Sequence, residues 1–173
     1  VDAINAGIGF VPEDRKNQGL ILGMSVMNNI TLPGLKHVSK VGVLRKLLEQ
    51  RVSDEYIEKL KIKTPHREQT VVNLSGGNQQ KVVVSKWLAT CPKVLIVDEP
   101  TRGIDVGAKK EIHSLMSSLA GSGVAVIMIS SELPEILGMS DRIIIMHDGT
   151  IRGELDRKFA SQERTMEMVL KGA

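Results

Sequence analysis

Short, wholly apolar runs alternate with helical patterns along the second half of this chain. The runs are residues 94–97, 124–129 and 143–146. Strands that are apolar throughout are typical of parallel sheets whose two faces are both covered by helices. The pattern therefore predicts an α/β fold on a mostly parallel sheet. Asp148 and Gly149 are a two-residue hairpin signal, which predicts an antiparallel hairpin at one edge of that sheet.

The first half of the chain carries a further strand and more helices. Residues 8–11 predict the strand, and a helix is expected within residues 20–32. Apolar residues recur at spacings of three and four over residues 43–62, with charged residues between them. This spacing predicts two amphipathic helices with a break near Ser53.

Three helical patterns fill the gaps between the later strands. Ser75 is a candidate N-cap for a helix that continues to Thr90. A second helix ends at Gly121, and a third spans residues 132–137 with Pro134 in its first turn. The apolar face of the second helix is predicted to consist of Ile112, Leu115, Met116 and Leu119.

Both ends of the chain carry patterns of their own. A terminal helix is predicted from Ser161 to Gly172. Its inward-facing residues are expected to be Met166, Val169 and Leu170. Residues 1–10 have neither an initiator methionine nor the layout of a secretory signal, so we expect the chain to begin inside a longer polypeptide.

Composition limits the classes of protein to consider. Of 173 residues, 42% are hydrophobic and 25% charged, which is typical of a soluble domain, and the net charge is only +3. This weak charge and the scarcity of aromatic residues argue against a nucleic-acid partner. The longest apolar run, residues 124–129, is far shorter than the roughly 20 residues of a membrane span. Cys91 stands alone, which excludes an internal disulfide. Lys59, Lys61 and Lys63 are either a solvated face or a patch for a partner.

Two consecutive glycines, Gly76 and Gly77, follow Ser75 at the predicted start of a helix. Unpaired amides give a helix N-terminus a partial positive charge, so this arrangement suits an anion. Ser75 adds a hydroxyl donor, and the amides of Asn78 and Gln79 could contact a phosphate or a ribose. The alternative interpretation is a glycine-rich turn with an ordinary N-cap.

A pair of acids follows the apolar run at residues 94–97. Asp98 and Glu99 would lie at the carboxyl end of a parallel strand, where α/β proteins usually bind their ligands. Asp98 suits Mg²⁺, and Glu99 suits activation of an attacking water molecule. The alternative is that both acids only cap the following turn.

These motifs occur in a specific order. Residues 74–81 resemble the signature motif of ATP-binding-cassette (ABC) ATPases, and residues 94–100 resemble their Walker B strand. Residues 101–105 match the D-loop, with Asp105 in its acidic position. More narrowly, the chain resembles the second nucleotide-binding domain of bacterial monosaccharide importers, in which two such domains are fused in one subunit. The segments that carry this narrower resemblance are residues 10–16, 74–81, 98–109 and 130–133.

The resemblance implies a P-loop-type ABC ATPase fold. Residues 20–90, approximately, would form the helical subdomain that carries the signature motif. Residues 91–173 would form the Walker B and switch part of the α/β core, including the hairpin and the terminal helix. We therefore expect one partial nucleotide-binding domain over residues 1–173.

The sequence also departs from the family pattern. No Gly-x-x-x-x-Gly-Lys-Ser/Thr occurs, so the P-loop that holds the β- and γ-phosphates is missing from these residues. Glu13 stands where the Q-loop usually has Gln, Ser131 stands where the switch His is usual, and Asn78 replaces the usual Gln of the signature. Ser131 is predicted to cap a helix by accepting a hydrogen bond from the amide of Leu133 or a neighbour.

ABC domains pair head to tail, so the resemblance implies two half-sites. Ser75, Gly76 and Gly77 would complete the ATP site of a partner domain. Asp98 and Glu99 would belong to a degenerate site, in which Asp98 binds the metal and Glu99 is the catalytic residue.

The implied function is ATP hydrolysis that powers monosaccharide import, with ATP and Mg²⁺ as cofactors. The implied partners are a second nucleotide-binding domain, membrane permeases that contact residues 13–62 and, indirectly, a sugar-binding protein. The implied location is the cytoplasmic face of the bacterial inner membrane, and the isolated chain is expected to be inactive. The alternatives are a non-catalytic dimerisation or regulatory module and, less consistent with the short helices in residues 43–73, a DNA-repair or chromosome-organising ATPase.

Overall fold

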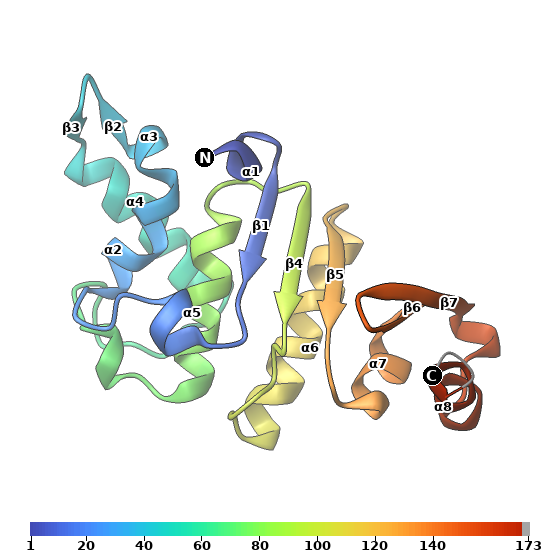
Figure 1. Cartoon of the computed structure of the whole chain (residues 1–173). Helices are drawn as coiled ribbons and strands as arrows, with labels where there is room; N and C mark the ends of the chain where they lie inside the picture. The colour runs from blue at the N-terminus through green and yellow to red at the C-terminus, as the bar shows by residue number, and fades with distance from the viewer. Residues whose placement is uncertain (171–173) are drawn as a thin grey trace. The chain divides into compact units, whose positions relative to one another are not determined.

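The computed structural model describes the backbone of residues 1–170 and the side chains of residues 1–168. The chain divides into two compact units, Val1–Ile129 and a second unit that begins at Ser130. Figure 1 shows the elements of both units, which are described separately below. None of the described helices is both long enough and apolar enough to span a membrane.

A three-stranded parallel sheet forms the centre of the first unit. Its strands are β1 (Ile8–Val11), β4 (Val94–Asp98) and β5 (Ala125–Ile129), in the order β1-β4-β5. Both pairings are parallel, so all three strands end at the same edge of the sheet (Figure 1). The predicted α/β class and the strands predicted at residues 8–11, 94–97 and 124–129 are confirmed.

The two faces of this sheet differ in burial. Leu95 and Val97 are buried on one face, where the backbone of Gly9 lies against Trp87 of α5 (Gly76–Leu88). The opposite face carries Phe10, which pairs in register with Ile96 and, one strand further, Ile127.

Two large side chains on this second face are half exposed, Phe10 at 42% and Ile127 at 52%. Within residues 1–129, helices do not cover this second face, so the first unit by itself does not meet the prediction of cover on both faces. A wholly apolar strand indicates that both faces of its sheet are buried in the protein. The pattern does not show which part of the protein buries them.

Six helices belong to the first unit. They are α1 (Asp2–Asn5), α2 (Val26–Thr31), α3 (Leu35–Val38), α4 (Lys46–Lys59), α5 and α6 (Val106–Gly121). Of these, α5 packs against strand β1 of the sheet and α6 against strand β5. The helix expected within residues 20–32 is α2. Shorter elements join them: a π-helical turn at Arg15–Gly19, 3₁₀ turns at Leu32–Gly34 and Val71–Asn73, and the short antiparallel strands β2 (Ser39–Lys40) and β3 (Val43–Leu44).

Helix α4 is continuous, so the predicted break near Ser53 is wrong. The Ser53 hydroxyl is buried and donates a hydrogen bond of 2.8 Å to the Gln50 carbonyl oxygen one turn earlier. The hydroxyl is therefore satisfied inside the helix. Near the end of the same helix, the Tyr56 hydroxyl donates to the Leu88 carbonyl oxygen at 2.8 Å and ties α4 to the end of α5.

The second unit contains α7 (Leu133–Met139), β6 (Arg142–His147), β7 (Thr150–Asp156), a 3₁₀ turn (Arg157–Phe159) and α8 (Gln162–Leu170). Strands β6 and β7 form the predicted hairpin. Asp148 and Gly149, with φ of 48° and 73°, both adopt the left-handed conformation that a tight two-residue turn requires.

The hairpin forms a two-stranded sheet of its own within the described residues. Residues 143–146, predicted as a further strand, belong to β6 of this two-stranded sheet. Ile143, Ile145 and Leu155 form a small buried core against which Met168 of α8 packs.

Helix α8 presents a different face from the one predicted. Met166 is 47% exposed, whereas Thr165 is buried. The inward placement of Met166 is therefore wrong. The side chains of Val169 and Leu170, and the predicted helix end at Gly172, lie outside the described residues.

Candidate nucleotide site

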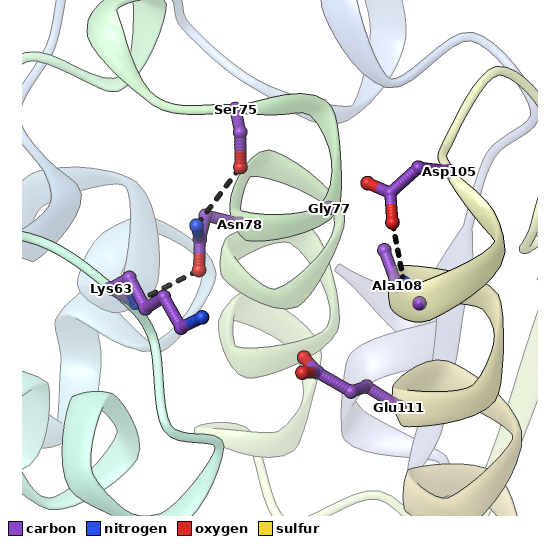
Figure 2. A pocket seen from close by; sticks show the side chains of 8 residues that line it. Lys63, Ser75, Gly77, Asn78, Asp105, Ala108 and Glu111 are labelled. Atoms are coloured by element: carbon purple, nitrogen blue, oxygen red, sulfur yellow. Dashed lines mark hydrogen bonds between the residues drawn. The ribbon is translucent and has the colours of Figure 1, made fainter.

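The signature segment forms the start of α5, and Ser75 is its N-cap, as predicted. The Ser75 side chain makes no capping bond to the helix backbone. Its hydroxyl oxygen instead accepts a hydrogen bond of 2.9 Å from the Asn78 side-chain amide. The Asn78 amide oxygen in turn accepts a hydrogen bond of 2.8 Å from the backbone N–H of Lys63 (Figure 2). Asn78 thus links the signature to the loop after α4.

Several hydrogen-bond donors at this helix start have no acceptor in the described part of the chain. The first backbone bond of the turn runs from Gln79 N to the Ser75 carbonyl oxygen at 2.9 Å, which leaves the amides of Gly76, Gly77 and Asn78 unpaired. Because the Ser75 oxygen accepts from Asn78, its own proton is available for donation. These donors suit the oxygens of a phosphate group.

Gly77 has a packing role that the sequence does not reveal. A Cβ at this position would lie only 2.7 Å from the Cβ of Ala108 in α6. Glycine therefore allows α5 and α6 to approach closely. Any side chain at residue 77 must move α6 as well as enter the space where a ligand would bind.

A pocket of about 280 Å³ opens in front of this helix start (Figure 2). Its lining residues are Lys63, Ser75, Gly77, Asn78, Asp105, Gly107, Ala108 and Glu111. They come from the signature helix, from the loop before it and from the start of α6. The pocket therefore lies where the predicted signature and D-loop motifs meet.

The charged groups in this pocket differ in whether they already have a partner. Asp105 is the N-cap of α6, and a hydrogen bond of 3.0 Å from the Ala108 amide holds the pKa of its carboxyl below the usual value. Glu111 forms an ion pair of 2.7 Å with the buried ammonium of Lys81, which lowers the pKa of Glu111. Lys63 forms no ion pair among the described residues. Its ammonium is thus the cation available to an incoming anion.

Gln79 does not lie where the sequence places it. Its side chain is buried, and its amide nitrogen donates to the Val71 carbonyl oxygen at 3.2 Å. The expectation that this amide contacts a nucleotide does not agree with the structure. One helical position separates Gln79 from Asn78, and that rotation turns its side chain into the interior.

Asp98 and Glu99 stand at the end of β4, as predicted. The Asp98 carboxylate is half-buried and has no hydrogen bond or ion pair within residues 1–168. An unpaired carboxylate in this place fits a bound cation such as Mg²⁺. The described residues contain no cluster of three or more His, Cys, Asp or Glu that could hold a metal. Asp98 would therefore share the ion with oxygens of another molecule or segment.

Glu99 has an unusual backbone conformation. Its φ is 45°, in the left-handed region that non-glycine residues seldom adopt, and its N–H donates to the Ile129 carbonyl oxygen at 2.9 Å. Such conformations cost roughly 1–3 kcal/mol and cluster at functional sites. This observation agrees with a functional role for Glu99.

Residues 12–19 form the segment after β1, and Glu13 is an exposed residue of this segment. It forms an ion pair with Arg102, the second residue of the D-loop segment. This guanidinium supplies the positive charge that a carboxylate at the Q-loop position would need. The neighbouring Arg15 also contacts the D-loop, and neither arginine was identified from the sequence. The Arg15 contacts join residues that are 87 and 88 positions apart in the sequence. Contacts between such distant residues leave no periodic pattern or motif in the sequence.

Ser131 belongs to the second unit and does not occupy the cap position. Helix α7 begins at Leu133 with Glu132 as its N-cap, so Ser131 stands one residue before the cap position at which it was predicted. The preceding residue, Ser130, accepts a hydrogen bond of 3.1 Å from the Glu132 amide and donates one of 2.5 Å to the carboxylate of Glu135. The Ser130 hydroxyl therefore stabilises this turn.

Fold and site together define a nucleotide-binding cassette, and comparison with known sequences agrees. The sequence profile of the ABC transporter family matches residues 1–102, more than half of the chain. The chain belongs to this family.

Two similar proteins have names that refer to sugar import. The chain is 55% identical to the ribose import ATP-binding protein RbsA of Bacillus licheniformis over 99% of its own length and 35% of the relative's. It is 56% identical to the xylose import ATP-binding protein XylG of Thermoanaerobacter pseudethanolicus over 95% of its length and 33% of the relative's. The chain thus spans about a third of the curated relatives it matches.

A solved structure agrees with the fold. A dimeric ATP-binding cassette bound to ADP and phosphate after hydrolysis superposes with a TM-score of 0.72 at 24% identity. The match covers 87% of this chain and 62% of the other. It supports the ABC ATPase fold of the chain.

Proposed function

We propose that the chain is part of the ATP-hydrolysing subunit of an ABC importer for a monosaccharide, and that it supplies the signature half of an ATP site in a second cassette. The observation that carries this proposal is the start of α5, where unpaired amides and the Ser75 hydroxyl border a pocket. The names of the relatives, which are ribose and xylose importers, support the substrate class.

The signature residues would act on the terminal phosphate of ATP held by the partner cassette. The amides of Gly76 and Gly77 and the hydroxyl of Ser75 can donate to its oxygens, and the positive end of the α5 dipole favours its charge. Hydrogen bonds to a charged oxygen contribute about 1.5–3 kcal/mol each. These donors are fixed before the ligand arrives, so their orientation costs little during the reaction.

The acids at the end of β4 would belong to the chain's own ATP site. Asp98 would hold Mg²⁺, which neutralises phosphate charge when bound. Glu99 would accept a proton from, or orient, an attacking water molecule. We propose that this site is degenerate, because Glu13 is paired with Arg102 and Ser131 replaces the usual switch histidine.

The proposed assembly follows from the family. It comprises a second nucleotide-binding domain placed head to tail, permease subunits that contact residues 13–62, and a sugar-binding protein that delivers the substrate. The assembly would lie at the cytoplasmic face of the bacterial inner membrane. The proposal includes no nucleic-acid partner and expects the 173-residue chain to be inactive by itself.

Uptake of labelled ribose and xylose into vesicles tests the proposal. The complete subunit, its permeases and the sugar-binding protein would be reconstituted with internal ATP, beside a Ser75→Ala variant and the control Ser117→Ala, an exposed serine of α6. We expect ATP-dependent uptake that falls by about 10- to 100-fold in Ser75→Ala, since one charge-assisted hydrogen bond is lost, and is unchanged in Ser117→Ala.

The competing hypothesis is a non-catalytic dimerisation or regulatory module. It predicts an intact assembly in which Ser75→Ala leaves uptake and ATP turnover unchanged. That result would contradict the proposed function.

A further inference from the structure

Arg15 joins three segments that are far apart in the sequence. Its guanidinium donates to the Arg102 carbonyl oxygen at 2.9 Å and to the Gly103 carbonyl oxygen at 3.2 Å. It also lies against the first residue of α5, since a Cβ on Gly76 would be 2.9 Å from Nη2 of Arg15. One side chain of the segment after β1 therefore contacts both the D-loop and the signature.

A second contact joins the same two loops. The Glu13 carboxylate pairs with the guanidinium of Arg102. The side chain of Glu13 is 42% exposed and that of Arg102 is 67% exposed. Ion pairs this exposed contribute little to folding stability because water and salt screen them. The pair is thus better suited to fixing loop geometry than to stabilising the fold.

The D-loop carries this geometry to the pocket. Gly103, with φ of 67°, adopts a turn that residues with a side chain rarely form. Two residues later, Asp105 caps α6 and lines the pocket in front of Ser75. A displacement of residues 102–103 must therefore change the position of Asp105 or the turn between them.

We infer that Glu13 and Arg15 are positioning residues that clamp the D-loop and the start of the signature helix to the segment after β1. The inference rests on the proposed function, in which this segment contacts the permease. Movement of the segment would then shift the D-loop and Gly76 together. ATP hydrolysis in the partner's site would depend on the position of this permease-facing segment.

The chemistry of arginine explains why the clamp needs this residue. A guanidinium presents several N–H donors in a rigid plane and can hold two carbonyl oxygens at once, whereas a lysine ammonium is a single point of charge on a flexible stem. Arg15→Lys keeps the charge and loses the fixed double contact. It is therefore expected to behave like Arg15→Ala.

A charge-reversal cycle in the complete importer tests the ion pair. Glu13→Arg and Arg102→Glu would each be compared with the double variant. Lys110→Glu, at an exposed residue of α6 outside residues 13–62, is a control with the same charge change as Arg102→Glu. We expect each single reversal to lower transport-stimulated ATP turnover at least fivefold, with little change in melting temperature, and the double variant to recover to within twofold. Single reversals without effect, or a double variant no better than the worse single variant, would overturn the inference.

Hydrogen exchange in the complete subunit without permease provides a readout independent of transport. The amides of residues 101–105 should exchange at least fivefold faster in Arg15→Ala and Arg15→Lys than in the wild type or Lys16→Ala. Unchanged exchange in the Arg15 variants would overturn the clamp. A wild-type importer without uptake, together with faster exchange in the Arg15 variants, would instead contradict the proposed function and retain the clamp.

Discussion

The start of α5 and the end of β4 both belong to the first unit, yet they differ in how firmly hydrogen bonds hold their polar side chains in place. At the start of α5, Ser75 and Asn78 are linked by a hydrogen bond, and Lys63 is linked to Asn78. At the end of β4, Asp98 has no partner among the described residues, and the sheet face that carries Phe10 is half exposed.

The difference indicates which chemistry these residues can complete by themselves. A signature half-site needs oriented donors, and the described residues hold those donors in place. A site for a whole Mg²⁺-ATP also needs groups that surround the phosphates, and Asp98 and Glu99 by themselves do not provide them. We therefore expect changes at the signature to have larger effects than changes at the acids.

The largest effect is expected for Gly77→Asp in the complete importer. The new carboxylate would repel the partner's terminal phosphate, and the new Cβ would collide with Ala108. We expect ATP turnover to fall by a factor of about 100 or more, a loss of roughly 3 kcal/mol in barrier stabilisation.

The collision and the charge can be separated with a second substitution. Ala108→Gly removes the methyl group that the new side chain meets, so the double variant should recover part of the lost melting temperature. Turnover should remain lost because the carboxylate is still present. Recovery of turnover in the double variant would show that Gly77 matters for packing alone.

Glu99→Gln should have a much smaller effect on the same importer. If the acids at the end of β4 belong to a degenerate site, turnover should remain within about threefold of the wild type, a barrier change below about 0.7 kcal/mol. Steady-state ATPase assays measure this directly. A loss as large as that in Gly77→Asp would reverse the assignment of the two half-sites.

The serines before α7 are expected to affect stability more than chemistry. Ser130→Ala removes the hydroxyl that bonds both the Glu132 amide and the Glu135 carboxylate, and should cost about 1 kcal/mol. The corresponding fall in melting temperature is about 2–4 °C. Ser130→Ala and Ser131→Ala should both keep turnover per folded molecule within about threefold. A hundredfold loss of turnover in Ser131→Ala with unchanged melting would show that Ser131 acts in the reaction.

The smallest effect on the importer is expected at the hydrogen bond between Tyr56 of α4 and the Leu88 carbonyl oxygen at the end of the signature helix. Burial raises the pKa of Tyr56 to about 12 from its ordinary value of 10.0. The stability that depends on the neutral phenol should therefore be complete below pH 10 and be lost as pH rises through about 12.

Tyr56 is the single tyrosine of the chain, so tyrosinate absorbance reports on this residue alone. Titration of the native chain should give a midpoint near 12, and titration in denaturant a midpoint near 10. A native midpoint near 10 would mean that α4 does not hold the end of α5 as described.

Local patterns predicted most of the secondary structure. The apolar runs identified β4 and β5, and Asp148 with Gly149 identified the hairpin, because each signal depends on neighbouring residues alone. The break at Ser53 was wrong because a small polar residue can satisfy its hydroxyl within a helix. No statistical pattern distinguishes that outcome from a helix end.

The sequence predicted which residues lie at the start of α5 better than it predicted which contacts they make. Ser75, Gly76 and Gly77 lie where the motif suggests, and the close approach of Ala108 adds a packing reason for Gly77. Gln79 was misplaced because its direction depends on the helix phase set by tertiary packing. The contacts of Arg15 depend on how distant loops meet, which sequence spacing does not encode.

Photocleavage with trapped vanadate tests the central claim most directly. Vanadate occupies the position of the terminal phosphate in a complex with Mg²⁺ and ADP, and ultraviolet light then cuts the backbone that touches it. In the complete subunit, the proposed head-to-tail arrangement predicts cleavage of this chain within residues 75–77. Intact residues 75–77, with cleavage of this chain confined to the neighbourhood of Asp98 and Glu99, would contradict it.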